Sequence, residues 1–302
     1  MKIWISDWNN ILHDVIKSLY EKSHDFTDKV EDADVVVMWN EAGGIGRPVI
    51  EKAKELGIRT VLLQHGRRGS SRFYPPFSEK LLSDVICVWG PGDVKRLRGA
   101  DVPADRIITT GTTIHGHMKP REKHQGINVV FSPEHWPGGE IDENKWIADE
   151  LKKLPKKYKV TTKILSQEHD AMLYDNPVGS NRNDPYHLDT VADVLKTADV
   201  VVGMSESTFE LLAESMDIPV VIADIWVPKK AMDDERYLDY QREYSNACTL
   251  SSLEDLNKNI KRAIKKPKLL RKERAQIAID DGGTHIENPK QNIINIIENV
   301  SN

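Results

Sequence analysis

Short apolar runs rich in β-branched residues alternate along the chain with longer stretches in which apolar positions recur at a helical period. Such runs are typical of parallel strands buried on both faces, and such stretches are typical of helices that cover a sheet. In the first part of the chain the pattern predicts helices at Asn10–Lys22 and at Arg47–Leu56, the latter ending before Gly57. The strands that it predicts there are Lys2–Ser6, Val35–Trp39, Thr60–Gln64, Asp84–Trp89 and Arg106–Thr110.

A polar segment at His115–Gly126 interrupts this alternation, and its composition is typical of a linker. The pattern then restarts and predicts, in order, Ile127–Ser132 (strand), Glu143–Leu154 (helix), Tyr158–Ser166 (strand), Leu188–Thr197 (helix), Asp199–Met204 (strand), Thr208–Met216 (helix), Val220–Asp224 (strand) and helices over most of Ser252–Val300. The sequence therefore predicts an α/β protein with two Rossmann-like domains, residues 1–120 and 121–302. The last helix is a candidate to pack back on the first domain.

Open α/β sheets bind ligands at the carboxyl ends of their strands, so we expect the two domains to face each other across a ligand-binding cleft. The composition agrees with a globular protein, because 39% of the 302 residues are hydrophobic and 29% are charged. The formal net charge of −5 argues against general nucleic-acid binding and leaves room for a local basic patch. The run Lys261–Arg274 holds eight basic residues and predicts a solvated helix face, with binding to anionic lipid or to a polymer such as DNA as the alternative.

The cysteines, the histidines and the hydropathy pattern argue against a disulfide-rich protein, a metalloprotein and a membrane-spanning protein. Cys87 lies in the apolar run Val85–Trp89, which predicts that its thiol is buried and does not belong to a disulfide framework. The histidines of the linker region (His115, His117 and His124) have no metal-ligand spacing, so we expect no metal and no cofactor. No apolar run approaches the roughly 18 residues that a membrane span needs, and we expect a cytoplasmic protein.

The clearest candidate for chemistry is His65, which follows the strand Thr60–Gln64 directly and precedes Gly66. An imidazole at a strand tip can accept a proton from an attacking hydroxyl, and a glycine beside it lets a ligand approach the backbone. The arginines that follow are candidates to bind phosphate or an anionic acceptor: Arg67, Arg68 and Arg72. The alternative is a surface loop with a structural histidine and solvated arginines.

Two strand ends in the second domain carry candidate donor-binding residues. After Asp199–Met204, hydroxyl side chains precede a helix start, where free N–H groups suit a diphosphate; the candidates are Ser205, Ser207, Thr208 and the nearby Glu210. After Ile127–Ser132, the candidates are Ser132, Glu134 and His135. Helix capping without a ligand is the alternative for the first group, and a turn anchored by Trp136 is the alternative for the second.

A glycine-rich loop at Met38–Pro48 matches neither the dinucleotide fingerprint nor a P-loop. We interpret it as an acceptor-side loop, in which Asn40 and Glu41 are candidates to bind hydroxyl groups.

Several segments together resemble enzymes of the GT-B superfamily, in the same order along most of the chain. Val37–Asn40, Ala53–Ile58 and Gln64–Gly66 resemble the N-terminal half of bacterial capsular polysaccharide transferases. Val88–Gly90 with Ile107–Gly111 resembles those proteins and the UDP-N-acetylglucosamine 2-epimerases. Val130–Pro133 resembles the CDP-glycerol glycerophosphotransferases, and Ala198–Val202, Ser207-Thr208 and Ile218–Val221 resemble the donor-binding half of the superfamily.

This resemblance implies a GT-B fold, a nucleotide-activated donor, no required metal, a histidine base at His65 and diphosphate contacts at Ser207 and Thr208. The sequence departs from the family at two positions. His169 lies two or three residues from where the glycerophosphotransferases carry a second histidine, and Leu212 stands where many GT-B enzymes have a ribose-binding glutamate, with Glu210 and Glu214 two residues to either side.

These observations predict a metal-independent glycosyltransferase that moves a sugar or sugar-like group from a nucleotide-activated donor to an acceptor hydroxyl. The acceptor is expected to be a polymer or a modified nucleic acid, and DNA with hydroxymethylated bases is one alternative acceptor. A peripheral contact of the protein with a membrane is a further alternative. The alternatives are a nucleotide-sugar 2-epimerase, in which Glu134, His135 and Glu210 would move protons, and a nucleotide-sugar-binding protein without catalysis.

Overall fold

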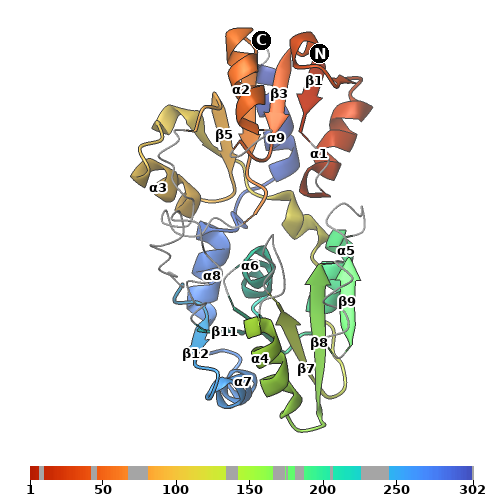
Figure 1. Ribbon diagram of the computed structural model, residues 1–302, viewed down its shortest axis with the longest axis vertical. Helices are drawn as coiled ribbons and strands as arrows, with labels where there is room; N and C mark the ends of the chain where they lie inside the picture. The colour runs from red at the N-terminus through yellow and green to blue at the C-terminus, as the bar shows by residue number, and fades with distance from the viewer. Residues whose placement is uncertain are drawn as a thin grey trace. The chain divides into compact units, whose positions relative to one another are not determined.

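The computed structural model describes residues 1–6, 10–41, 46–66, 81–133, 142–165, 174, 176–180, 187–204, 207–225 and 245–300. The chain divides into two compact units (Figure 1). Unit 1 comprises Met1–His115 with Ile279–Asn302, and unit 2 comprises Gly116–Ala278. The sequence-based boundary at residue 120 falls within unit 2. The C-terminal segment, which the sequence assigns to the second domain with its last helix a candidate to pack on the first, belongs to unit 1.

Unit 1 is built on a six-stranded parallel sheet with the strand order β2-β1-β3-β4-β5-β6. The strands are β1 (Lys2–Ile5), β2 (Asp25–Thr27), β3 (Val35–Met38), β4 (Arg59–Leu63), β5 (Val85–Val88) and β6 (Ile107–Thr109). Every residue of β3 and β5 is buried, which agrees with the continuous apolar runs of these strands. The edge strand β2 has the mixed sequence Asp-Phe-Thr and no continuous apolar run.

Helices cover both faces of this sheet: α1 (Asn10–Glu21), α2 (Gly46–Glu55), α3 (Pro91–Gly99) and α9 (Pro289–Val300), with short 3₁₀ turns at Val30–Asp32, Ala104–Arg106 and Thr113–His117. Helix α9 packs beside α1 (Figure 1) and places Ile293, Ile294 and Ile297 in the same core cluster as Val35 of β3. Burial of these isoleucines explains why the end of the chain belongs to unit 1.

Unit 2 is built on a second six-stranded parallel sheet, with the order β12-β11-β10-β7-β8-β9. Its strands are β7 (Ile127–Ser132), β8 (Tyr158–Leu165), β9 (Pro177–Ser180), β10 (Val200–Gly203), β11 (Val220–Ala223) and β12 (Thr249–Ser251). Numbered within the unit, this is the 3-2-1-4-5-6 order of the doubly wound nucleotide-binding fold. The direction of winding reverses between β7 and β10, and ligands of such sheets bind beyond the carboxyl ends of the strands at this point.

The helices of unit 2 are α4 (Asp142–Lys152), α5 (His187–Leu195), α6 (Thr208–Ser215), α7 (Leu256–Lys265) and α8 (Arg271–Asp280). One core cluster joins the sheet to α4 and α7 through Phe131, Leu151 and Ile260. The predicted linker is bound to unit 2, because Lys119 pairs with Asp193 at 2.8 Å and the Glu122 amide donates to the Lys196 carbonyl. Among the described residues no helix has the length and apolar composition needed to span a bilayer.

Candidate active site

His65 lies at the carboxyl end of β4, where the sequence predicts it. Its Nδ1 atom is 2.7 Å from the backbone oxygen of Trp39, which follows the adjacent strand β3, and its ring packs edge-on against the Trp39 indole with centroids 4.7 Å apart. A carbonyl can only accept a hydrogen bond, so Nδ1 carries the proton and the neutral ring has its lone pair on Nε2. This tautomer gives His65 a basic nitrogen on the side of the ring away from the Trp39 carbonyl.

The preceding residue, Gln64, holds this turn in place and was not singled out from the sequence. Its buried side chain donates from Nε2 to the Gly66 carbonyl at 2.9 Å and accepts at Oε1 from the Trp89 amide at 2.8 Å. Its own carbonyl accepts from the Trp89 indole N–H at 3.0 Å. Gln64 therefore ties the backbone on both sides of His65 to the end of β5.

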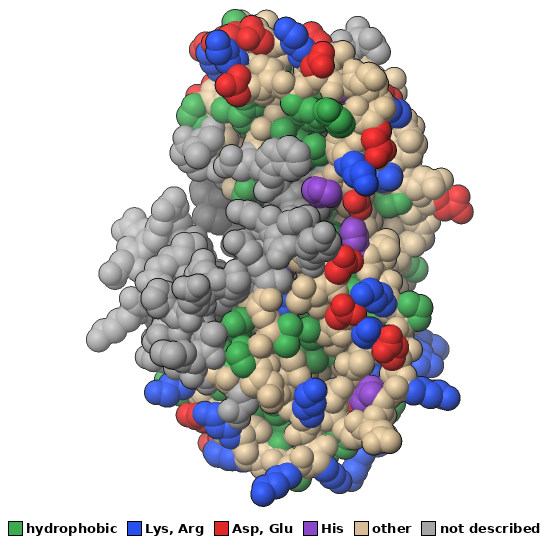
Figure 2. All heavy atoms as spheres, turned by 90° about the vertical axis from the view of Figure 1, so that its right-hand side faces the viewer, with side chains coloured by type: hydrophobic (Ala, Val, Ile, Leu, Met, Phe, Trp, Pro, Cys, Tyr) green, Lys and Arg blue, Asp and Glu red, His purple; other side chains and the backbone are tan. Residues whose placement is uncertain are grey.

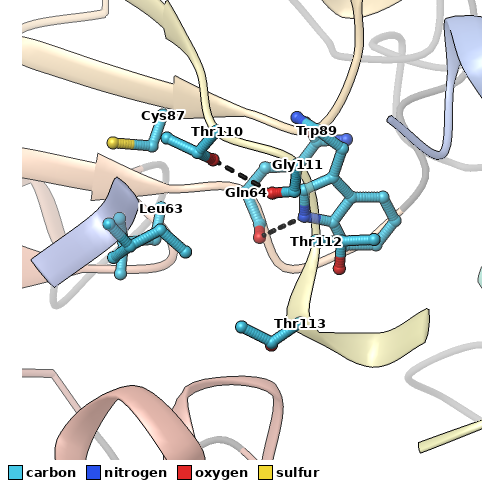
Figure 3. A pocket seen from close by; sticks show the side chains of 9 residues that line it. Leu63, Gln64, Cys87, Trp89, Thr110, Gly111, Thr112 and Thr113 are labelled. Atoms are coloured by element: carbon cyan, nitrogen blue, oxygen red, sulfur yellow. Dashed lines mark hydrogen bonds between the residues drawn. The ribbon is translucent and has the colours of Figure 1, made fainter. Parts of the chain in front are cut away.

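A pocket opens at the carboxyl ends of β4, β5 and β6 (Figure 3). Gln64 and Trp89 line it together with the hydroxyl residues Thr110, Thr112 and Thr113. Its remaining lining residues are Leu63, Cys87, Gly111 and Ile293. Its volume of about 10 Å³ has room for roughly one water molecule, and the side chains of Gln64 and Thr110 already hydrogen-bond to backbone groups. As predicted, the Cys87 thiol is buried, and burial raises its pKa to about 12.

A buried charge cluster connects α3 to the segment after α8. Arg96 donates to Asp93 at 2.9 Å and to Asp281 at 2.7 Å, and neither carboxylate side chain is more than 6% exposed. Burial raises the pKa of Asp93 despite the opposing charge of Arg96. Gly283 (φ +60°) packs so closely that an added Cβ would lie 1.9 Å from the Trp89 oxygen, so only glycine fits there.

Glu41, predicted to bind an acceptor hydroxyl, is 3% exposed and faces the segment before β5. Its carboxylate accepts from the Leu82 amide at 2.5 Å, from the Ser83 amide at 3.1 Å and from the Ser83 hydroxyl. Since both of its oxygens already accept hydrogen bonds within the chain, Glu41 supports this segment and is not open to a bound molecule. Its neighbour Asn40 is exposed and stays a prediction as an acceptor contact.

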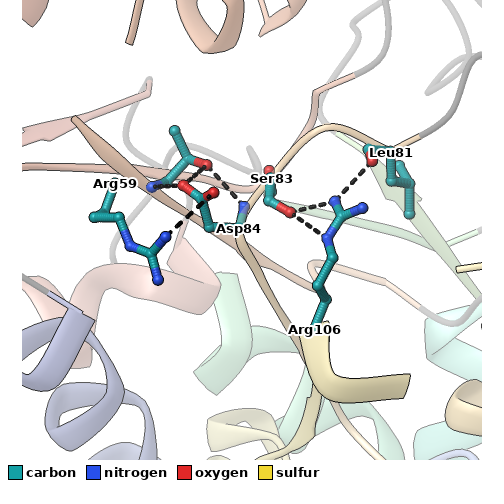
Figure 4. Close-up of polar contacts among 6 residues, drawn as sticks. Arg59, Leu81, Ser83, Asp84 and Arg106 are labelled. Carbon is teal, nitrogen blue, oxygen red and sulfur yellow. Dashed lines mark hydrogen bonds and ion pairs between the residues drawn. The ribbon is translucent and has the colours of Figure 1, made fainter. Parts of the chain in front are cut away.

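Further hydrogen bonds hold the segment before β5 (Figure 4). Arg106 donates to the Leu81 carbonyl at 2.7 Å and to the Ser83 carbonyl at 2.9 Å, while Asp84 accepts from the Thr60 amide at 2.8 Å. These bonds fix the point at which the chain re-enters the sheet after residues 67–80. The predicted anion-binding residues Arg67, Arg68 and Arg72 belong to that stretch, outside the described residues.

In unit 2 the described donor candidates follow the two strands between which the winding reverses. Ser132 ends β7 and pairs in register with Gly203, which ends β10. Ser207 is the N-cap of α6, the helix that comes after β10 in the chain, and Thr208 is its first residue. Because Ser132 and the start of α6 come from the two strands that flank the reversal, the fold brings these candidates together. Glu134, His135, Ser205 and His169 lie outside the described residues, and their roles stay predictions.

The start of α6 is a complete capping box. The Ser207 hydroxyl accepts from the Phe209 amide at 3.2 Å and donates to the Glu210 carboxylate, which also accepts from the Ser207 amide at 3.0 Å. Glu210 is 1% exposed, so its carboxylate belongs to the cap and not to an open ligand surface. Capping, the alternative considered from the sequence, therefore accounts for Ser207 and Glu210, whereas Thr208 stands at the first helical position.

The three histidines of the predicted linker, His115, His117 and His124, have different neighbours. His117 lies 3.8 Å from Asp189 and His124 lies 3.5 Å from Asp199. Burial lowers the pKa of His115, with a hydrogen bond to the Gly282 backbone opposing that shift. In the part of the chain that the structure describes, no three His, Cys, Asp or Glu side chains gather as metal ligands would.

No family model matches the chain, and no curated protein matches it in sequence. Solved structures match it in fold over nearly its whole length. The wall teichoic acid polymerase TagF with CDPG superposes with a TM-score of 0.64 at 11% identity, covering 99% of this chain and 88% of that one. UDP-GlcNAc 2-epimerase from Neisseria meningitidis bound to UDP-GlcNAc gives 0.63 at 11% identity, covering 99% and 100%.

Anabaena Alr3699/HepE in complex with UDP-glucose gives a TM-score of 0.58 at 10% identity, covering 98% of this chain and 99% of that one. These are the enzyme types that the sequence motifs resemble. At such identities the likeness concerns the fold, and it agrees with the two parallel sheets described above. The chain has the two-domain α/β fold of the GT-B enzymes.

Proposed function

We propose that this chain is a glycosyltransferase that transfers a sugar or sugar-like group from a nucleotide-activated donor to an acceptor hydroxyl, without a metal. The observation that carries the proposal is the 2.7 Å contact between His65 Nδ1 and the Trp39 carbonyl, since it leaves Nε2 as the base. The doubly wound order of unit 2 supports a nucleotide donor at the ends of β7 and β10. The similar proteins TagF and HepE, whose structures hold CDPG and UDP-glucose, support the same class of donor.

In the proposed reaction the acceptor hydroxyl gives its proton to His65 Nε2 while its oxygen attacks the transferred carbon of the donor. The bond from that carbon to the diphosphate oxygen breaks, and the nucleotide leaves with the electron pair. Thr208 and the positive end of the α6 dipole would stabilise the charge that develops on the diphosphate. The capping box of Ser207 and Glu210 would hold the start of α6 in the required conformation.

A test of the proposal is the release of UDP from UDP-GlcNAc and UDP-glucose, and of CMP from CDP-glycerol as a comparison, with a panel of acceptors. We expect His65→Ala to lower turnover by about 10² to 10⁴ while donor affinity changes little, which is typical of a lost general base. His13→Ala removes a partly exposed histidine of unit 1 and serves as the matched control. Wild-type turnover in His65→Ala would make this histidine structural, with His135 and His169 the next candidates.

A nucleotide-sugar 2-epimerase is the second candidate, because the similar Neisseria epimerase is covered over its full length. The burial of Glu210 in the capping box argues against the proton-moving role that this alternative gives it. Incubation of the protein with UDP-GlcNAc alone distinguishes the two reactions, because an epimerase needs no acceptor. Formation of the 2-epimer without an acceptor would favour the epimerase.

A further inference from the structure

The outward side of α7 in unit 2 is entirely cationic. The helix turns Leu256, Ile260 and Ala263 into the core, where none is more than 6% exposed. At about 100° per residue, the four residues opposite this apolar stripe fall within an arc of about 100°. These four residues are Lys258, Lys261, Arg262 and Lys265.

The sequence segments that follow α7 and the last turn of α4 are also basic. Residues 256–272 contain eight Lys and Arg and no Asp or Glu, and residues 152–159 contain five Lys and no Asp or Glu. The two segments are neighbours, because Asn257 of α7 donates to the Glu150 carbonyl of α4 at 2.9 Å and both helices share one core cluster. We call these thirteen cations the basic face; they are Lys152, Lys153, Lys156, Lys157, Lys159, Lys258, Lys261, Arg262, Lys265, Lys266, Lys268, Arg271 and Lys272.

Neighbouring carboxylates neutralise only part of the basic face. Within the described chain, Lys152, Lys153, Lys258 and Arg271 form ion pairs, with Asp149, Glu150, Asp255 and Asp217 respectively. The other nine cations have no described carboxylate within 4 Å. So much charge of one sign on a chain with a net charge of −5 costs repulsion, and an anionic partner would remove that cost.

Two large apolar side chains border the basic face and indicate the type of partner. Leu269 is 38% exposed between Lys268 and Arg271, and Trp146 of α4 is 44% exposed. Trp146 lies one helical turn before Glu150, whose carbonyl is bonded to α7. Tryptophan and leucine among cations are typical of surfaces that enter the lipid headgroup region, whereas a phosphate backbone alone offers no apolar partner to Leu269.

The basic face is also distant from the candidate donor site within unit 2. Figure 1 shows α7 and the end of α4 beside the amino ends of the strands, whereas Ser132 and Thr208 lie at their carboxyl ends. Blue side chains also line the lower border of Figure 2, which belongs to unit 2. A charged substrate at the donor site would therefore not cover this surface. We propose that the basic face binds a membrane surface containing anionic lipid, independently of the reaction that the chain catalyses.

Co-sedimentation of the full chain with vesicles tests this proposal. The vesicles contain phosphatidylcholine with about 30% phosphatidylserine, or phosphatidylcholine alone, in about 0.1 M salt. We expect binding only to the anionic vesicles. Each Lys near such a surface contributes roughly a fivefold factor to partitioning, so Lys261→Glu/Lys265→Glu/Lys268→Glu should bind at least about 100-fold less tightly.

The matched control is Lys17→Glu/Lys54→Glu/Lys95→Glu, which reverses three exposed lysines of unit 1 and changes the net charge equally. We expect it to keep most of the vesicle binding, and both variants to keep the wild-type melting temperature. Equal losses in the two variants, equal binding to neutral vesicles, or undiminished binding of the α7 variant would overturn the proposal. Binding to duplex DNA without binding to anionic vesicles would also overturn it and would assign the basic face to nucleic acid.

Discussion

Two adjacent hydroxyl residues at the start of α6 should have separable roles, although the sequence predicts the same donor contact for both. Ser207 uses its hydroxyl within the capping box, as acceptor from Phe209 N–H and as donor to the Glu210 carboxylate. Thr208 is the first helical residue and is only partly buried. We therefore expect Ser207→Ala to affect mainly folding and Thr208→Val to affect mainly donor binding.

The structure gives the size of each effect. Ser207→Ala removes an N-cap, which costs about 1 kcal/mol, and a hydrogen bond to a buried carboxylate, which costs about 1.5 to 3 kcal/mol. The free energy of unfolding should fall by about 2.5 to 4 kcal/mol, which corresponds to roughly 5 to 16 °C in melting temperature. Thr208→Val keeps the branched shape and loses only a hydroxyl. If that hydroxyl binds a diphosphate, donor affinity should fall by roughly 10- to 100-fold.

Thermal unfolding and calorimetric titration with UDP-GlcNAc, UDP-glucose and CDP-glycerol measure both quantities on the same two variants. We expect Ser207→Ala to unfold at a lower temperature and to bind the donor within about threefold of wild type. We expect Thr208→Val to keep the wild-type melting temperature and to bind the donor more weakly. Lost donor affinity in Ser207→Ala at an unchanged melting temperature would refute the capping account. Unchanged affinity in both variants would mean that the donor does not bind at the start of α6.

Three further predictions concern other parts of the chain. Gln64→Ala should lower turnover by about 10- to 100-fold at unchanged donor affinity, because Gln64 positions the turn that carries His65. Steady-state kinetics and a donor titration will measure the two quantities, and normal turnover would contradict this positioning role. Activity should persist in EDTA, and full loss restored by Mg²⁺ or Mn²⁺ would refute the proposed metal-free departure of the diphosphate. Asp217→Asn should cost about 3 kcal/mol in urea unfolding, because it removes a charge partner from Arg274, which is 1% exposed. Burial alone would raise the pKa of Asp217, but the hydrogen bonds and charges of Arg271 and Arg274 hold it below 3.8. The folded pKa is thus below the unfolded one, so this stabilisation is complete above pH 3.8 and is lost as the pH falls through the folded value. Wild type and Asp217→Asn should therefore converge in acid, and a constant difference would contradict the ion-pair account.

The regular elements of the core could be predicted because their signal is local. Strands such as β3, β5 and β10 are short apolar runs, and burial on both faces of a parallel sheet requires such runs. The place of His65 after β4 also follows from the order of the residues alone. By contrast, β2, β9 and β12 are edge strands, paired on one side only, and their sequences lack a continuous apolar run.

What each polar side chain contacts was decided by the tertiary structure. Glu41 and Glu210 have the composition of ligand-binding residues, yet each carboxylate accepts hydrogen bonds from its own chain, Glu41 from a segment about 40 positions away. The last helix was a candidate to pack on the first domain, and the fold places the α9 isoleucines in the core of unit 1. A sequence pattern records which faces must be buried, whereas the partner of each face depends on packing between segments that are distant along the chain. The sequence therefore determined the two α/β units, the position of His65 and the basic run of Lys261–Arg274, while packing determined the tautomer of His65 and the partners of Glu41 and Glu210.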